Sequence, residues 1–233
     1  MGLLTKGYLK ELYDRLWLES LDHVLAQGFG FDSGIDDPND DRFGITLLVR
    51  PDEKVIGRIQ GFMDRVRAIE PNHHFYPESD MHVTVMSIIS CYSGFSLKGI
   101  DEQEYIDLIA ACIDGMESSK LQFRGVTLSP SCVLIQGFPL DNLLDKIRGK
   151  LRTAFGNAPL EQSLDKRYPL QTYHSTVIRF KEEVQKKGEI LRLLEDFRDF
   201  DFGVSPIKEV ELVFNDWYQR ERFVKKLFVF GLK

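Results

Sequence analysis

Apolar residues follow two different spacings along the chain, and each spacing predicts one kind of element. Between residues 5 and 27 they recur at helical intervals and stop before Gly28, which predicts an amphipathic N-terminal helix. The same spacing predicts further helices over residues 52–69, 101–116, 140–155 and 184–200. Short apolar runs between turn residues predict strands over residues 43–50, 81–90, 121–128, 131–137, 171–180, 207–218 and 222–232.

The order of these elements indicates the fold class. The N-terminal helix is followed by a Gly- and Asp-rich loop over residues 29–41. Each half of the remaining chain is predicted as helix, loop, strand, helix and two strands. Strands that are neighbours in the sequence favour antiparallel or mixed sheets with helices on one face, so we expect an α+β fold.

One ten-residue segment occurs twice, which suggests two related halves. Residues 76–85 and 168–177 share five positions at one offset of 92 residues. The shared positions are Tyr76, Pro77, His82, Thr84 and Val85, which recur as Tyr168, Pro169, His174, Thr176 and Val177. Proline restricts the residue before it to extended geometry, so we interpret each Tyr-Pro pair as setting the entry into a strand, with stacking on a base as the alternative.

The repeat places a histidine and a threonine on one face of each predicted strand, because side chains alternate along a strand. Two imidazoles and two hydroxyls suit acid–base chemistry on a phosphate ester. One neutral histidine can take a proton while the other, protonated, gives one to the leaving oxygen. The threonine hydroxyls can donate hydrogen bonds to the phosphate oxygens. The pattern does not reveal which histidine is the acid.

These two segments resemble the motifs of the two-histidine phosphoesterase superfamily, which contains bacterial 2′-5′ RNA ligase-like proteins and cyclic nucleotide phosphodiesterases. The superfamily motif alternates hydrophobic residues with a histidine and a Thr or Ser. Here it stands as Met81-His82-Val83-Thr84-Val85 and as Tyr173-His174-Ser175-Thr176-Val177. Ser175 departs from the usual apolar residue, but we expect it to face away from the cleft.

The resemblance covers about residues 42–233 and implies a bilobal fold of two pseudo-symmetric sheets around a central cleft. Residues 1–41 form a separate N-terminal helix and acidic loop, and the two sequence halves are about 42–138 and 139–233. It implies a metal-independent phosphodiesterase that acts on a 2′,3′-cyclic phosphate, a 2′-5′ linkage or another small cyclic phosphodiester. His82 and His174 would be catalytic, and Thr84 and Thr176 would bind the substrate. The alternatives are a non-catalytic module that binds a nucleotide or RNA end, and the RNA-ligase direction of the same chemistry.

Composition limits the classes of binding partner and the cellular compartment that we expect. The net charge of −6 argues against an extended nucleic-acid footprint, so we expect a small nucleotide or an RNA end as the substrate. No apolar run is long enough for a membrane span and the N-terminus lacks a signal-peptide core, so no membrane partner is expected. Three scattered cysteines favour a reducing cytoplasm over a disulfide framework. No cofactor is expected, and the sequence leaves the oligomeric state open.

Other polar clusters have simpler interpretations. His73 and His74 lie near Glu78 and Asp80, but adjacent residues of an extended loop point apart, which disfavours a metal site. The acidic stretch over residues 32–41 lacks the ligand spacing of an EF-hand and is interpreted as a solvated loop. One cation near the C-terminus could reach the cleft and hold a phosphate, and the candidates are Arg220, Arg222, Lys225 and Lys226.

Overall fold

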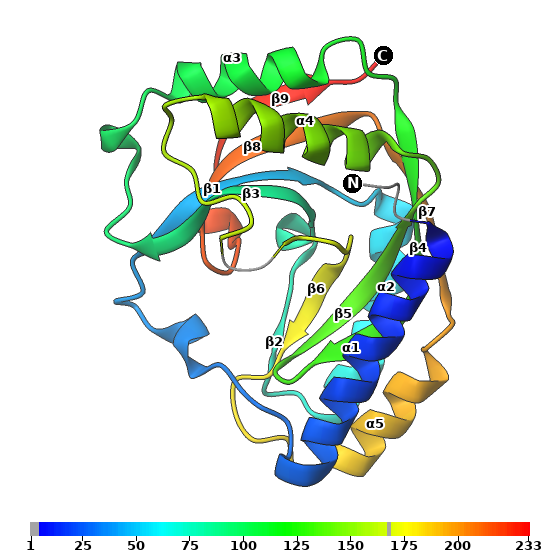
Figure 1. The fold of residues 1–233 in the computed structure, drawn as a ribbon. Helices are drawn as coiled ribbons and strands as arrows, with labels where there is room; N and C mark the ends of the chain where they lie inside the picture. Colours follow the sequence, from blue (N-terminus) through cyan, green and yellow to red (C-terminus); the bar gives the residue numbers. More distant parts are fainter. Residues whose placement is uncertain (1–4, 167–168) are drawn as a thin grey trace.

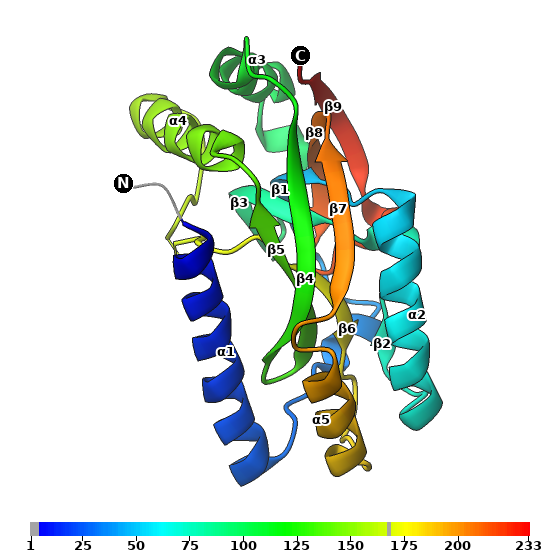
Figure 2. The ribbon, with the colours of Figure 1, turned by 90° about the vertical axis from the view of Figure 1, so that its right-hand side faces the viewer.

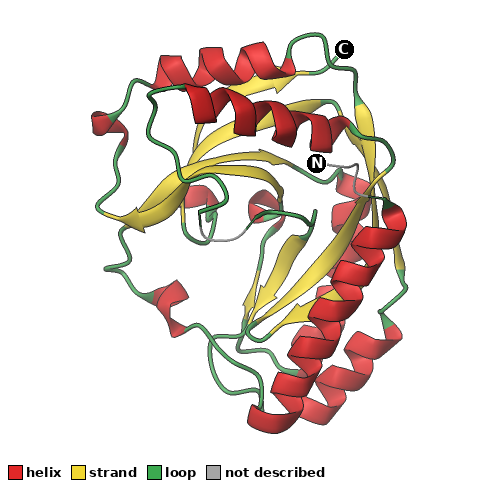
Figure 3. Cartoon of the chain, viewed as in Figure 1, coloured by secondary structure: helices red, strands yellow, loops and turns green. Residues whose placement is uncertain are grey.

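Two antiparallel sheets carry the fold, as the computed structural model shows for residues 5–166 and 169–233 (Figures 1 and 3). The elements in chain order are α1 (Lys6–Gln27), β1 (Arg42–Val49), α2 (Glu53–Ile69), β2 (His74–Phe75), β3 (Val83–Ser93), α3 (Glu102–Ile113), β4 (Ser119–Ser129), β5 (Cys132–Pro139), α4 (Leu143–Asn157), β6 (Ser175–Arg179), α5 (Lys187–Asp196), β7 (Asp201–Ile207), β8 (Glu209–Asp216) and β9 (Lys225–Gly231).

Sheet A has the strand order β3-β1-β8-β9, and sheet B has the order β2-β6-β5-β4-β7. Every strand pair recorded in the described residues is antiparallel. The predicted α+β class with two sheets is therefore confirmed. Each sheet draws on distant parts of the chain, because sheet A combines β1 and β3 with the last two strands. The division expected near residue 42 stays a prediction.

The helices tie the two sheets together. Helix α2 lies in the sequence between β1 and β3, both in sheet A, yet it packs on β7 and β6 of sheet B. Helix α4 lies between β5 and β6, both in sheet B, yet it packs on β3 of sheet A and on α3. Helix α1 runs along β4 and β5, and Figures 1 and 2 show α1 and α2 on opposite sides of sheet B.

The sequence explains the length and the orientation of α1. The Thr5 side chain accepts a hydrogen bond from the Tyr8 N–H at the start of the helix, and Gly28 ends the helix with a positive φ of 85°. A stripe at helical spacing faces the sheet and is buried, and it consists of Leu9, Tyr13, Trp17, Ser20 and Val24. Among the described residues no helix is both long and apolar enough to cross a membrane.

Several element boundaries differ from the predicted ones. The predicted strand over residues 171–180 is only Ser175–Arg179, so His174 lies just before β6, as His82 lies just before β3. The predicted strand over residues 207–218 includes the last residue of β7 and the whole of β8. Lys208 separates these two strands and connects sheet B to sheet A. Strand β7 was missed because Gly203 and Pro206 resemble a turn; a proline is tolerated there because β7 is an edge strand. The missed β2 is only two residues long.

Candidate active site

Residues of both sheets line one cleft with a volume of about 240 Å³. The lining includes all four residues of the sequence repeat that were expected to carry chemistry, namely His82, Thr84, His174 and Thr176. The volume is below the roughly 300–1,000 Å³ of pockets for drug-sized ligands. The cleft is therefore smaller than a typical pocket for a drug-sized ligand.

His82 is held by the turn before β3. Its Nδ1 lies 2.8 Å from the carbonyl oxygen of Asp80, and a carbonyl can only accept, so Nδ1 carries the proton. In the neutral ring this leaves the lone pair on Nε2. Asp80 is fixed in turn, because its carboxylate accepts a hydrogen bond from the Glu221 N–H at 2.9 Å. Arg50 donates to the carbonyl oxygen of Ser79 at 2.5 Å and so braces the same turn.

His174 is held differently. Its Nδ1 lies 2.9 Å from the hydroxyl oxygen of Thr172, a group that can either donate or accept. The hydroxyls of Thr84 and Thr176 have no intramolecular hydrogen-bond partner within the described residues. Both threonines are half-buried and line the cleft, so their hydroxyls are available to a ligand.

Burial lowers the pKa of both imidazoles. The pKa of His82 falls to about 4, chiefly because burial disfavours the charged ring. The pKa of His174 also falls to about 4, chiefly through burial and then through the charges of His82 and Arg148. Both histidines are therefore neutral at pH 7 in the protein without a ligand. A negative charge near either ring would raise its pKa again.

The segment before the first motif binds the strand of the second motif. Strand β2 pairs with β6, with His74 opposite Arg179 and Phe75 opposite Ile178. The N–H of Tyr76 continues the ladder by donating to the carbonyl oxygen of Val177 at 3.0 Å. Tyr76 is 2% exposed and anchors the segment between β2 and β3 to β6. That each Tyr-Pro pair sets the entry into a motif strand stays a prediction. Tyr168, its counterpart in the repeat, lies outside the described residues.

A buried arginine from α4 also joins the two motifs. The Arg148 guanidinium donates to the carbonyl oxygens of Val85 at 2.8 Å, Thr84 at 3.2 Å and Thr172 at 2.8 Å. Its charge lies 3.8 Å from the centre of the Tyr173 ring, which adds a cation–π contact. The side chain thus bridges the first motif strand and the segment that leads into the second motif. Sequence reasoning missed it, because an arginine in an amphipathic helix is typically on the solvent side.

Arg179 supplies a cation in the cleft lining. Its position follows from a bulge: β5 pairs Leu134 with Thr176 and Val133 with Ile178, so Val177 has no partner on β5. The extra residue brings Thr176 and Arg179 to the same face of β6. Of the cations proposed from the sequence, none lines the cleft. Arg220 is instead buried against Asp216, at a distance of 2.7 Å.

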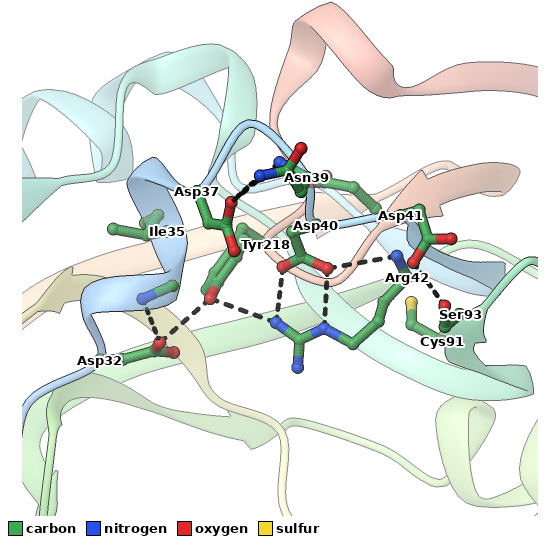
Figure 4. A network of polar contacts seen from close by, with 12 residues as sticks. Asp32, Ile35, Asp37, Asn39, Asp40, Asp41, Arg42, Cys91, Ser93 and Tyr218 are labelled. Carbon is green, nitrogen blue, oxygen red and sulfur yellow. Dashed lines mark hydrogen bonds and ion pairs between the residues drawn. The ribbon is translucent and has the colours of Figure 1, made fainter.

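The acidic loop is joined to the wall of this cleft. Asp32 accepts a hydrogen bond from the Tyr218 hydroxyl at 3.0 Å (Figure 4). It also accepts one from Arg179 at 3.1 Å. Arg42 binds the Asp40 carboxylate through two nitrogens and also donates to the Tyr218 hydroxyl at 3.3 Å. The expectation of a merely solvated loop was therefore wrong for this part, because its carboxylates are paired with cations.

His73 and His74, the adjacent histidines considered as a metal site, do not line this cleft. The His73 ring packs edge-on against Phe180, and the His74 ring packs edge-on against Tyr76. Over residues 5–166 and 169–233, no group of three or more His, Cys, Asp and Glu side chains is arranged to hold a metal ion. The structure thus gives neither histidine a set of metal ligands within the described chain.

The fold and the cleft define a class: an α+β protein with two interlocked antiparallel sheets and a small polar cleft that holds two histidines. Comparison with solved structures finds this fold in E. coli LigT complexed with 3′-AMP, with 14% identity, a TM-score of 0.55 and coverage of 82% of this chain and 99% of LigT. The protein TT0787 of Thermus thermophilus gives 15% identity, a TM-score of 0.54 and coverage of 82% of this chain and 97% of that one.

A protein described as a phosphoesterase is similar at 13% identity, with a TM-score of 0.50 and coverage of 82% of this chain and 99% of that one. At these identities the likeness concerns the fold, which this chain shares with LigT and with the protein described as a phosphoesterase. No family model and no curated protein matches the sequence.

Proposed function

We propose that this protein is a phosphodiesterase that uses His82 and His174 as its general acid–base pair and needs no metal ion. The observation that carries the proposal is that both histidines and both threonines of the repeat line one small cleft. The proposed substrate is a nucleotide or RNA end that carries a 2′,3′-cyclic phosphate, a 2′-5′ linkage or another small cyclic phosphodiester. The LigT structure with bound 3′-AMP supports a small nucleotide ligand for this fold.

The geometry supports a simple sequence of proton transfers. Neutral His82 holds its proton on Nδ1, so its Nε2 can accept the proton of a water that attacks phosphorus. His174, protonated once the anion is bound, gives its proton to the ribose oxygen as the P–O bond breaks. The products are a phosphomonoester and a free ribose hydroxyl. In the ligation direction the same two groups exchange roles, so the assignment of base and acid depends on direction.

The remaining polar groups stabilise the phosphate. The free hydroxyls of Thr84 and Thr176 donate to its non-bridging oxygens, and Arg179 adds a positive charge at the cleft wall. All three cysteines are free thiols, which supports our further proposal that the protein works in the reducing cytoplasm.

The test is turnover of a panel of 2′,3′-cyclic nucleotides and 2′-5′ and 3′-5′ dinucleotides in the presence of a chelator. We expect His82→Ala and His174→Ala each to lower kcat by about 10²- to 10⁴-fold, because each removes one proton-transfer group. The control is His23→Ala, which changes a half-buried histidine of α1 outside the cleft. Full activity in both cleft variants would refute the proposal. Tight binding without product would favour the binding module, and product that the chelator abolishes would point to a metal.

A further inference from the structure

Helix α1 reaches the second motif through one hydroxyl group. Strands β5 and β6 pair with Ile135 opposite Ser175, and the same antiparallel register continued by two residues sets Gly137 opposite Tyr173. The recorded ladder ends at Ile135 and Ser175, before this pair. The side chain of Tyr13 occupies the place of the missing bonds.

The phenol binds three of the four backbone groups that would form this pair. The Tyr13 hydroxyl donates to the carbonyl oxygen of Gly137 at 3.2 Å and accepts from the N–H of Gly137 at 3.3 Å and of Tyr173 at 3.0 Å. A hydroxyl has one proton and two lone pairs, so the backbone uses its full capacity. Burial raises the pKa of Tyr13 to about 12, which keeps the donor protonated at physiological pH.

The surroundings fix both partners of this contact. Tyr13 is fully buried, its ring packs edge-on against Phe138 at 5.4 Å, and its carbonyl oxygen accepts from Thr127 at 3.0 Å. A Cβ atom at position 137 would lie 2.0 Å from the Tyr173 carbonyl oxygen, so only glycine permits the close approach. The backbone of Tyr173 is thus clamped between Gly137 and the helix.

Tyr173 directly precedes His174. Its side chain is also held, because its hydroxyl lies 2.5 Å from the Asp145 carboxylate and its ring faces Arg148. Since His174 lies just before β6, its path is set by these contacts and not by the strand ladder. A rotation of the Tyr173 peptide would move the imidazole relative to His82 across the cleft.

We propose that Tyr13 is a positioning residue for His174, and that helix α1 contributes to the site through this one side chain. The inference rests on the proposed phosphodiesterase function for its kinetic consequence but not for its geometry. Tyr13 itself does not line the cleft. It holds the second motif where the chain enters strand β6 of sheet B.

The test compares Tyr13→Phe with Ser20→Ala. Ser20 lies on the same helix, is 4% exposed and donates to the carbonyl oxygen of Leu128 at 3.1 Å, so both variants remove one buried hydroxyl that binds the backbone of sheet B. A misplaced catalytic group can cost about 10²-fold in rate. We therefore expect Tyr13→Phe to lower kcat at least about tenfold with little change in KM, and Ser20→Ala to leave kcat unchanged. Equal kcat values in the two variants would overturn the proposal.

Amide hydrogen exchange gives a readout that does not depend on activity. In the unaltered protein the Tyr173 amide should exchange at least about 100 times more slowly than an unprotected amide, and Tyr13→Phe should accelerate this exchange and shift the imidazole signals of His174. Free exchange of the Tyr173 amide in the unaltered protein would refute the contact itself, even if Tyr13→Phe fails to fold. If the unaltered protein cleaves no diester, the proposed function fails, while exchange and imidazole shifts still decide the positioning role.

Discussion

Binding of an anion in the cleft should be coupled to the uptake of a proton. Each imidazole has a pKa of about 4 instead of 6.5, so its affinity for a proton is weakened by a factor of roughly 300. At pH 7 only about one molecule in a thousand carries the charge at either ring. A bound anion must therefore raise the pKa of one imidazole, so that the ring gains a proton, before that ring can act as an acid.

Electrostatics sets the size of this coupling. A unit charge 4 Å from an imidazolium contributes about 4 kcal/mol at an effective dielectric constant near 20, which is about three pKa units. Binding should therefore raise the pKa of one histidine from about 4 to about 7. Between pH 4 and pH 7, the dissociation constant of the anion should therefore increase by up to about tenfold for each unit by which the pH rises.

Calorimetry of sulfate binding measures this directly, because sulfate keeps its charge across the range and is not hydrolysed. At pH 5.5 an imidazole with a pKa of about 4 is only about 3% protonated, whereas an ordinary imidazole is about 90% protonated. Titration in buffers of different ionisation enthalpy should thus show close to one proton taken up per sulfate. The double variant His82→Ala/His174→Ala should lose this uptake. A value near zero at pH 5.5 with full-strength binding would refute the burial argument.

Two further perturbations test the supports of the cleft. Arg148→Met keeps the side-chain length but leaves three backbone carbonyls without their donor. Thermal or chemical unfolding should therefore show that the free energy of unfolding falls by about 3 kcal/mol or more, and by less for Arg148→Lys. A Met variant as stable as the original protein would contradict the bridging role. Asp32→Asn removes the charge that faces Arg179 but keeps the oxygen that Tyr218 binds. Sulfate should therefore bind a few times more tightly at low salt, and the free energy of unfolding should change by less than about 1 kcal/mol. An unchanged sulfate affinity at low and high salt would show that Arg179 has no electrostatic interaction with the bound anion.

The sequence predicted the parts of this molecule that depend on local pattern. Helical spacing located α1 and α2 to within a residue at their first turns, and the repeat identified four side chains that line the same cleft. Their catalytic roles stay a prediction. The α+β class followed from element order, because neighbouring strands pair readily as hairpins.

The parts that it did not predict depend on register and distance. Alternation along β6 would turn Arg179 away from Thr176, and only the bulge at Val177 reverses this. Tyr13 resembles an ordinary apolar position of a helix, and nothing near it in the sequence indicates a partner 160 residues away. Such contacts are set by the assembled sheets, so a pattern confined to one segment does not contain them.

Helices α2 and α4 each pack on the sheet that does not contain the strand before them, and this arrangement constrains how the chain folds. Sheet A needs β8 and β9, which follow the other described strands in the sequence, to complete the sheet whose strand β3 begins directly after His82. Until then β1 has no partner on one side, and α4 has only part of the sheet on which it packs. Folding should thus wait for these two strands and occur as one cooperative event, with slow kinetics from its distant pairings. A chain that stops before residue 209 would retain all four residues of the repeat and still lack the framework that brings them together.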